Sequence, residues 1–228
     1  MSAGPFVFGD KRLGLWIAYS DALTDKLKHY LPRFRGAVPN LTDLFLPPQA
    51  GISHKDQCRQ AGFFTHTYDV AYGRGPVVFA KEALARRKVQ GTGALELNFE
   101  GSAITDAGMK QYITATIGQI RKTNPHLPVR INVVPFKGEF LPRDLINKDP
   151  ELYVIAQAYG GNMETLYAAD EVKRDLTAWG IFEPKVSVQH AIMCSGPGYA
   201  RQITLPVVRG RGSLYIDDLL LDAGLLPA

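Results

Sequence analysis

The sequence has few cysteines and no long apolar run. Two cysteines, Cys58 and Cys194, stand among 228 residues; these are too few for a disulfide framework, so we expect reduced thiols of a cytosolic protein. No apolar stretch reaches the roughly 20 residues that cross a bilayer. The N-terminal residues lack the basic-then-apolar pattern of a signal peptide. We therefore expect a cytoplasmic protein, or one secreted without such a peptide.

The motifs that hold metals, dinucleotides or nucleotide phosphates are also missing. The two cysteines and five histidines show neither C-x-x-C nor H-E-x-x-H spacing. The glycines of "GRGPVVFAK" are not followed by the Lys-Ser/Thr pair of a phosphate-binding loop. The sequence therefore predicts no metal site and no cofactor.

Positive charge is in mild excess, with a formal net charge of +4 and a sequence pI of about 9.0. The basic clusters are short and are not interleaved with aromatic residues, as a single-strand nucleic-acid groove would be. One interpretation is a solvated surface; the other is a site for an anionic ligand, and nucleic acid stays open as a partner. We expect the first cluster on the exposed face of a helix end. The clusters are Arg86, Arg87 and Lys88, and Arg209 and Arg211.

Residues 91–200 alternate between strand-like and helix-like segments. Apolar residues alternate with polar ones or run continuously in the predicted strands, and they recur at helical spacing between them. Such alternation predicts an α/β fold with a mainly parallel sheet flanked by helices. The predicted strands are 94–99, 129–136, 152–156 and 185–193, and the predicted helices are 105–123 and 167–180.

Residues 1–90 are irregular in pattern, with Pro and Gly scattered through them. Short strand-like and helix-like runs occur there, but they do not define a topology. We expect an N-terminal extension, residues 1–90, that packs on an α/β core formed by residues 91–228.

Cys194 directly follows the predicted strand 185–193 and precedes a turn of small residues. Ligands bind outside the carboxyl ends of the strands of open parallel sheets. A cysteine nucleophile needs a base and oxyanion donors, and a turn of small residues lets backbone N–H groups converge on one point. The alternative is that Cys194 is a small apolar residue at the end of a buried strand.

The order of features from 151 to 198 resembles the core of caspase-like (clan CD) cysteine peptidases. The segments follow one another as in that family: "LYVIA", "YGGN", "YAADEVKRDLTAWGI", "VSVQHAIM" and "CSGPG". Within it, their composition is most similar to that of the C80-type self-processing domains of bacterial toxins. The resemblance implies cleavage of a peptide bond in a peptide or protein substrate, or self-processing, with a highly phosphorylated activator. It implies Cys194 as the nucleophile and an oxyanion site at Gly160, Gly161, Ser195, Gly196 and Gly198.

The family keeps its catalytic histidine where this sequence has Gln157. A neutral amide does not serve as a general base. Three alternatives follow: the chain is an inactive descendant of the family, position 157 carries a substitution, or the resemblance to the family is accidental. His190 and His66 are the candidate replacements. His190 lies about 13 Å from Cys194 on an extended strand, which favours a buried core histidine instead. His66 has Asp69 three residues further on and lies outside the resembling region.

Two rival functions remain open. The chain could be a non-catalytic α/β module that binds an anionic partner through the two basic clusters. It could instead be a toxin-like transferase acting on a nucleotide, with the aromatic stretch 62–75, "GFFTHTYDVAYGRG", lining its pocket.

Overall fold

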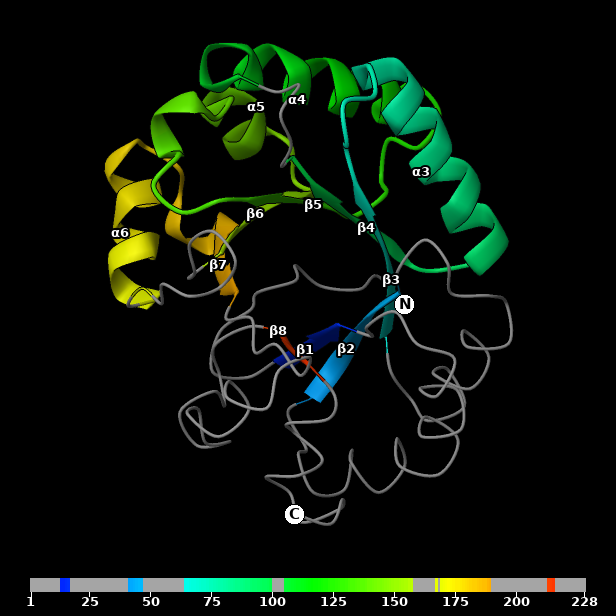
Figure 1. Cartoon of the computed structure of the whole chain (residues 1–228), viewed down its shortest axis with the longest axis horizontal. Coiled ribbons are helices and arrows are strands. Elements are labelled where there is room, and N and C mark those ends of the chain that lie inside the picture. Colours follow the sequence, from blue (N-terminus) through cyan, green and yellow to red (C-terminus); the bar gives the residue numbers. More distant parts are fainter. Residues whose placement is uncertain are drawn as a thin grey trace.

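A single sheet of eight parallel strands organises the chain (Figure 1). The computed structural model describes residues 13–16, 41–46, 64–99, 105–157, 167, 169–189 and 213–215, with side chains for 64–99, 105–157, 167 and 170–186. The strand order is β7-β6-β5-β4-β3-β2-β1-β8, and every neighbouring pair is parallel. The strands are β1 Leu13–Trp16, β2 Leu41–Leu46, β3 Phe64–Val70, β4 Ala94–Asn98, β5 Val129–Val133, β6 Leu152–Gln157, β7 Val186–Gln189 and β8 Ser213–Tyr215.

Helices connect the strands from β3 to β7 and cover one face of the sheet. Figure 1 shows them as an arc outside the curved sheet. Pro76 begins α3, where its missing N–H costs nothing, and the left-handed Gly91 ends it with an N–H that donates to the Arg87 carbonyl. Thr105 caps α4 by accepting a hydrogen bond from the Gly108 N–H. The helices are α3 Pro76–Gln90, α4 Asp106–Arg121, α5 Arg143–Lys148 and α6 Ala169–Ala178, with the 3₁₀ helices η1 Gly138–Phe140 and η3 Glu183–Lys185.

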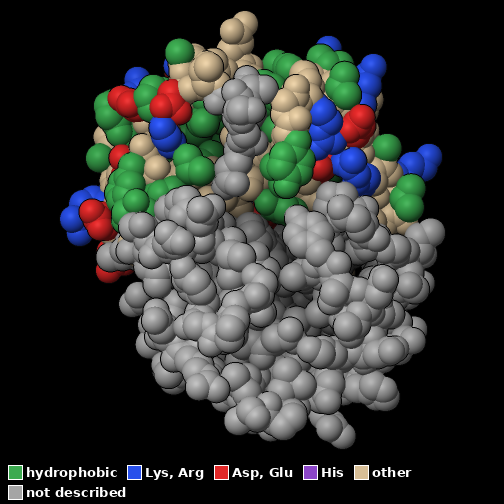
Figure 2. All heavy atoms as spheres, viewed as in Figure 1, with side chains coloured by type: hydrophobic (Ala, Val, Ile, Leu, Met, Phe, Trp, Pro, Cys, Tyr) green, Lys and Arg blue, Asp and Glu red, His purple; other side chains and the backbone are tan. Residues whose placement is uncertain are grey.

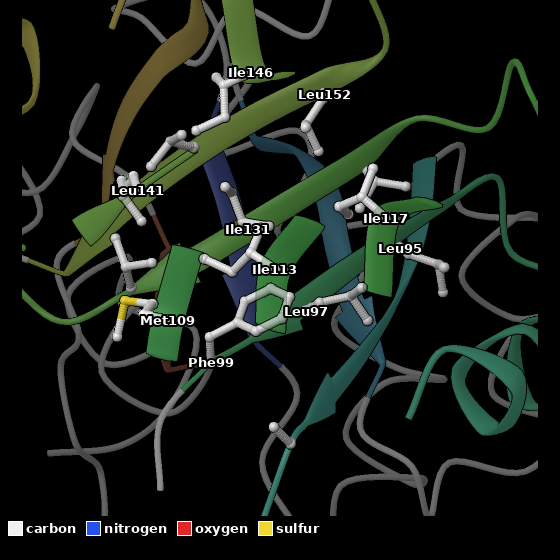
Figure 3. Close-up of a cluster of buried hydrophobic side chains, with 14 of the residues drawn as sticks. Leu95, Leu97, Phe99, Met109, Ile113, Ile117, Ile131, Leu141, Ile146 and Leu152 are labelled. Carbon is white, nitrogen blue, oxygen red and sulfur yellow. The ribbon is translucent and has the colours of Figure 1, made fainter. Parts of the chain in front are cut away.

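The apolar core lies between the sheet and these helices (Figure 3). Strand β4 contributes Leu95 and Leu97, and Phe99 follows directly after it at the next alternate position; α4 contributes Met109, Ile113 and Ile117 at helical spacing. Strands β5 and β6 and helix α5 complete the cluster with Ile131, Leu152 and Ile146. All of these side chains are buried. Burial of an aliphatic side chain contributes about 1.5–3 kcal/mol, so this layer supplies the main driving force for folding.

The strand residues between these core positions face the other side of the sheet. Successive side chains of a strand point to opposite faces, and the register aligns Tyr68 with Glu96, Glu96 with Arg130, and Asn98 with Asn132. The concave face of the sheet therefore carries a polar set. These residues are buried as well, apart from Tyr68, which is half-buried.

Sequentially ordered parallel strands with helices on the outer face are the topology of a (β/α)8 barrel. The predicted α/β class with a parallel sheet flanked by helices is confirmed. The sheet continues across residue 90, because β3 pairs with β4. Helix α5, which the sequence analysis did not predict, lies between β5 and β6. In the part of the chain that the structure describes, no helix has the length and apolarity to cross a membrane.

Candidate active site at the carboxyl ends of β3 to β6

Three amide side chains lie at the carboxyl ends of adjacent strands: Asn98 of β4, Asn132 of β5 and Gln157 of β6. Each is at most 2% exposed. Gln157 Nε2 donates to Asn132 Oδ1 at 2.9 Å, and Asn132 Nδ2 donates to Glu96 Oε1 at 2.8 Å. Asn98 Nδ2 donates to the Tyr68 hydroxyl at 2.8 Å. We call Tyr68, Glu96, Asn98, Asn132 and Gln157 the polar row.

Two opposite charges lie side by side on the same face, one residue pair deeper than Asn98 and Asn132. Glu96 and Arg130 are register partners on β4 and β5, and both are at most 1% exposed. Burying an isolated charge is costly, and the register places these two side chains of opposite formal charge on adjacent strands, whose backbones lie about 4.8 Å apart. Tyr153 follows on β6. Burial raises the pKa of its phenol, Glu151 and Asp149 raise it further, and Arg130 acts in the opposite direction.

His66 lies deeper still, beside Ala94. Its ring is fully buried and packs edge-on against Phe64, with ring centroids 4.9 Å apart. Asp69 belongs to the opposite, helix-facing side of β3, where Arg74 and Arg86 bind its carboxylate. Strand alternation therefore separates His66 from Asp69. His66 and Gln157 also lie three strand positions apart along the sheet.

Arg74 holds the loop between β3 and α3. Its guanidinium donates to Asp69 Oδ1 at 2.8 Å and to the Ala71 carbonyl at 3.1 Å, and it also binds the Val70 carbonyl and Glu82. Burial opposes its charge, but the hydrogen bonds and charges of Asp69 and Glu82 outweigh burial, so the pKa of Arg74 is raised. The loop is fixed by at least four hydrogen bonds from this one side chain.

The loop after β5 is anchored to two neighbouring segments. Lys137 Nζ donates to Asp106 Oδ2 at 2.6 Å at the start of α4. The ring of Phe136 packs edge-to-face on Tyr167, with ring centroids 4.9 Å apart. This loop and the β3–α3 loop follow the carboxyl ends of their strands, so both lie on the same rim of the sheet.

A second buried polar cluster lies on the opposite, helix-facing side of the sheet. The Thr67 hydroxyl donates to Gln90 Oε1 at 2.7 Å and lies 2.6 Å from the Thr92 hydroxyl. We call Thr67, Gln90 and Thr92 the helix-side cluster. It joins β3 to the end of α3 and has no access to the carboxyl rim, which makes it a matched control for the polar row.

The first basic cluster is less exposed than predicted. Figure 2 shows Lys and Arg side chains on the flank where α3 lies, but only Lys88 of the three is exposed. Arg86 is half-buried and binds the Asp69 carboxylate. Burial lowers the pKa of Arg87. An anion-binding role for these three residues stays a prediction.

A surface groove lies between α6 and η3. Lys173 binds Glu183 at 2.7 Å across it, and this contact lowers the pKa of the exposed Glu183 carboxyl. The groove is lined by Asp170, Lys173, Arg174, Thr177, Gly180, Ile181, Phe182 and Glu183. All of its lining residues lie between β6 and β7 in the chain, and none belongs to the polar row.

Most of the other predicted site residues lie outside the described part of the chain. Those outside the described residues are Cys194, His190, Gly160, Gly161, Ser195, Gly196, Gly198, Arg209 and Arg211. Of the predicted catalytic residues, the structure places His66 and Gln157 and does not bring them together.

Of the polar row, the sequence analysis singled out Gln157 and, within the aromatic stretch 62–75, Tyr68. It missed Glu96, Asn98 and Asn132, which belong to the polar halves of two predicted strands. The signal that could have found them is repetition: "LELN" and "VRINV" place polar residues at equivalent alternate positions of two successive strands, close to the ends where ligands bind in parallel sheets.

No family model matches the chain, and no curated protein matches its sequence. Solved structures match over nearly the whole chain. A malate synthase from Haloferax volcanii has a TM-score of 0.54 and 12% identity, over 96% of this chain and 74% of the other. The catalytic domain of an endoglucanase from Thermobifida fusca has a TM-score of 0.52 and 13% identity, over 90% and 78%. A xylanase mutant from Cellvibrio japonicus has a TM-score of 0.51 and 12% identity, over 93% and 88%.

These structures are (β/α)8-barrel enzymes, and at such low identity the likeness concerns the fold. The resemblance to caspase-like cysteine peptidases is therefore wrong, and with it the predicted peptidase or self-processing function. Helix-connected parallel strands occur in both folds, but here β3 to β7 pair in strict sequence order. Two assignments were based on that resemblance and lose its support: Cys194 as the nucleophile, and Gln157 as the position of a replaced histidine. What the topology and the comparisons establish together is an α/β fold of the (β/α)8-barrel type.

Proposed function

We propose that the chain is a (β/α)8-barrel enzyme with its active site at the polar row. The substrate is a small molecule rich in hydroxyl or carbonyl groups. The observation that carries this proposal is the hydrogen-bonded set of Tyr68, Glu96, Asn98, Asn132 and Gln157 across four adjacent strands. Active sites of characterised barrels lie at the carboxyl ends of the strands.

Energetics support a functional origin of the polar row. Bulky branched apolar residues usually fill a barrel interior. A buried polar group that loses its partner costs about 1–3 kcal/mol, so a polar interior brings a risk that an apolar one avoids. The polar residues are also placed near the ends of β4, β5 and β6, where a ligand would meet them. Amides and a phenol both donate and accept hydrogen bonds, which suits hydroxyl and carbonyl groups.

The geometry suggests a role for each member. Glu96 is the carboxylate of the row and the proposed group for proton transfer. Asn132 orients it by donating to Oε1, and Gln157 in turn orients Asn132. Arg130, the register partner of Glu96, is the proposed counter-charge. Asn98 and Tyr68, which are hydrogen-bonded to one another, are the proposed substrate-binding pair.

The test uses a panel of methyl pyranosides, open-chain polyols, 2-oxoacids and sugar phosphates. Thermal shift measures their binding to the chain, and proton NMR measures their conversion. Glu96→Gln keeps the shape of the side chain and should bind the active compound but convert it at least 100-fold more slowly. Asn98→Ala should weaken binding about tenfold, the effect of one hydrogen bond.

Gln90→Leu in the helix-side cluster is the matched control, because it changes a buried, hydrogen-bonded side chain on the other face of the sheet. It should lower stability and leave ligand binding unchanged. Equal loss of binding in Asn98→Ala and Gln90→Leu, or conversion by Glu96→Gln at the wild-type rate, would contradict the proposal.

A further inference from the structure

Two aromatic side chains on the carboxyl rim are exposed to solvent. Tyr72 lies in the β3–α3 loop and is 72% exposed, and Phe136 follows β5 and is 39% exposed. Tyr72 comes two residues after the end of β3, and Phe136 comes three residues after the end of β5. Both therefore occur where a ligand of the polar row would enter.

Both residues also have unfavourable backbone conformations. Tyr72 has φ +39° and Phe136 has φ +58°, and among the described residues these are the two non-glycine positions with positive φ. A bulky residue rarely adopts this region because its Cβ crowds the backbone. Tyr72, which is 72% exposed, gains little burial in return. Strained positions of this kind gather at ligand clamps and active sites.

The surroundings hold each aromatic residue in place. The hydrogen bonds of Arg74 to Asp69 and to the Ala71 carbonyl fix the loop of Tyr72, and the Tyr112 hydroxyl binds the Arg74 carbonyl. Phe136 packs on Tyr167. Its neighbour Lys137 is bound to Asp106. The two rings are thus presented by loops that the chain's own hydrogen bonds, ion pair and ring contact fix, which reduces the entropy cost of binding.

We propose that Tyr72 and Phe136 form an aromatic rim that binds the face of a pyranose sugar above the polar row. This inference rests on the proposed function and names its substrate class. The C–H groups on a pyranose face pack against aromatic rings, and the ring hydroxyls match the amides of Asn98, Asn132 and Gln157. The described cations of these two loops, Arg74 and Lys137, are already paired with carboxylates. That pairing favours a neutral sugar over a phosphorylated one.

The experiment is saturation-transfer NMR and titration with methyl glucoside, methyl galactoside, methyl mannoside and methyl N-acetylglucosaminide. Sorbitol, pyruvate and adenosine are tested in parallel. At least one pyranoside should bind the full chain. Tyr72→Ala and Phe136→Ala should each weaken its binding five- to tenfold, whereas Tyr72→Phe should retain it. Tyr72→Gly accepts the positive φ without strain and should also lose affinity, which separates loss of the ring from loss of the fold.

Phe182→Ala is the matched control. Phe182 is 61% exposed, has an ordinary φ of −62° and precedes η3 near the amino end of β7. Its substitution should leave pyranoside binding unchanged. If sorbitol or pyruvate binds, and its binding depends on Asn98 and not on Tyr72, the proposed aromatic rim is wrong. The proposed active site at the polar row is then retained. Adenosine binding that depends on Tyr72 would overturn the sugar class, and a chain that binds none of the probes would overturn both proposals.

Discussion

The hydrogen bond from Gln157 to Asn132 can be tested by a double-mutant cycle of Asn132→Leu and Gln157→Leu. Asn132 donates to the Glu96 carboxylate and accepts from Gln157. A hydrogen bond to a charged group contributes about 1.5–3 kcal/mol, and a buried amide that loses its acceptor costs about 1–3 kcal/mol. Asn132→Leu should therefore lower the free energy of unfolding by about 3–5 kcal/mol.

Gln157→Leu alone leaves Asn132 Oδ1 without this donor and should cost about 1–3 kcal/mol. In the Asn132→Leu background the same change no longer breaks this hydrogen bond, so it should cost about 1–3 kcal/mol less. The two losses should therefore be non-additive by about 1–3 kcal/mol. Equilibrium urea unfolding of the four proteins measures this coupling.

The control cycle combines Gln157→Leu with Thr67→Val. Thr67 lies on the helix-facing side of β3, three strands from β6, so these two losses should add within about 0.5 kcal/mol. The reasoning is refuted if the Asn132 and Gln157 losses also add within that margin, or if Asn132→Leu costs less than about 1 kcal/mol.

Three further predictions concern stability and are measured by urea unfolding. A Cβ at Gly93 would lie 2.4 Å from the Phe64 ring, so Gly93→Ala should lower the free energy of unfolding by about 1–3 kcal/mol. A Cβ at Gly118 in α4 meets nothing within 4 Å, so Gly118→Ala should raise it by about 0.5–1 kcal/mol. Arg121 binds Asp149 at 2.6 and 3.2 Å with little exposure of either side chain, so Arg121→Met should cost about 1–3 kcal/mol, and a loss no larger than that of an exposed pair would contradict this. Burial lowers the pKa of Lys185 below 10.5 in the folded chain. Between that lowered pKa and pH 10.5 the unfolded chain binds more protons than the folded chain, so this group makes the free energy of unfolding rise with pH. Lys185→Met should remove that rise.

The fold class could be predicted because hydrophobic periodicity is a local property. The predicted strands 94–99 and 152–156 correspond to β4 and β6, and the predicted helix 105–123 corresponds to α4. The sequence also placed ligand binding at the carboxyl ends of parallel strands, which is where the polar row lies. Helix α5 has only six residues, too few for a helical pattern to show.

The barrel topology could not be predicted because strand order depends on contacts between segments distant in the sequence. A strand–helix–strand pattern is compatible with every α/β topology. The order of segments around Cys194 favoured the caspase-like topology. The polar residues of β4 and β5 were overlooked for a similar reason. In an isolated strand, Glu96 and Asn98 indicate a solvent-facing side; in a curved parallel sheet that side is the buried interior.

Hydrogen exchange followed by mass spectrometry, with and without the panel compound that stabilises the chain most, tests the location of the site most directly. Binding at the polar row should slow exchange in the rim loops at 71–75 and 134–138 and leave 170–183 unchanged. Asn98→Ala should abolish that protection, and Gln90→Leu should preserve it. Protection confined to 170–183, the groove between α6 and η3, would contradict the assignment of the functional site to the carboxyl ends of β3 to β6.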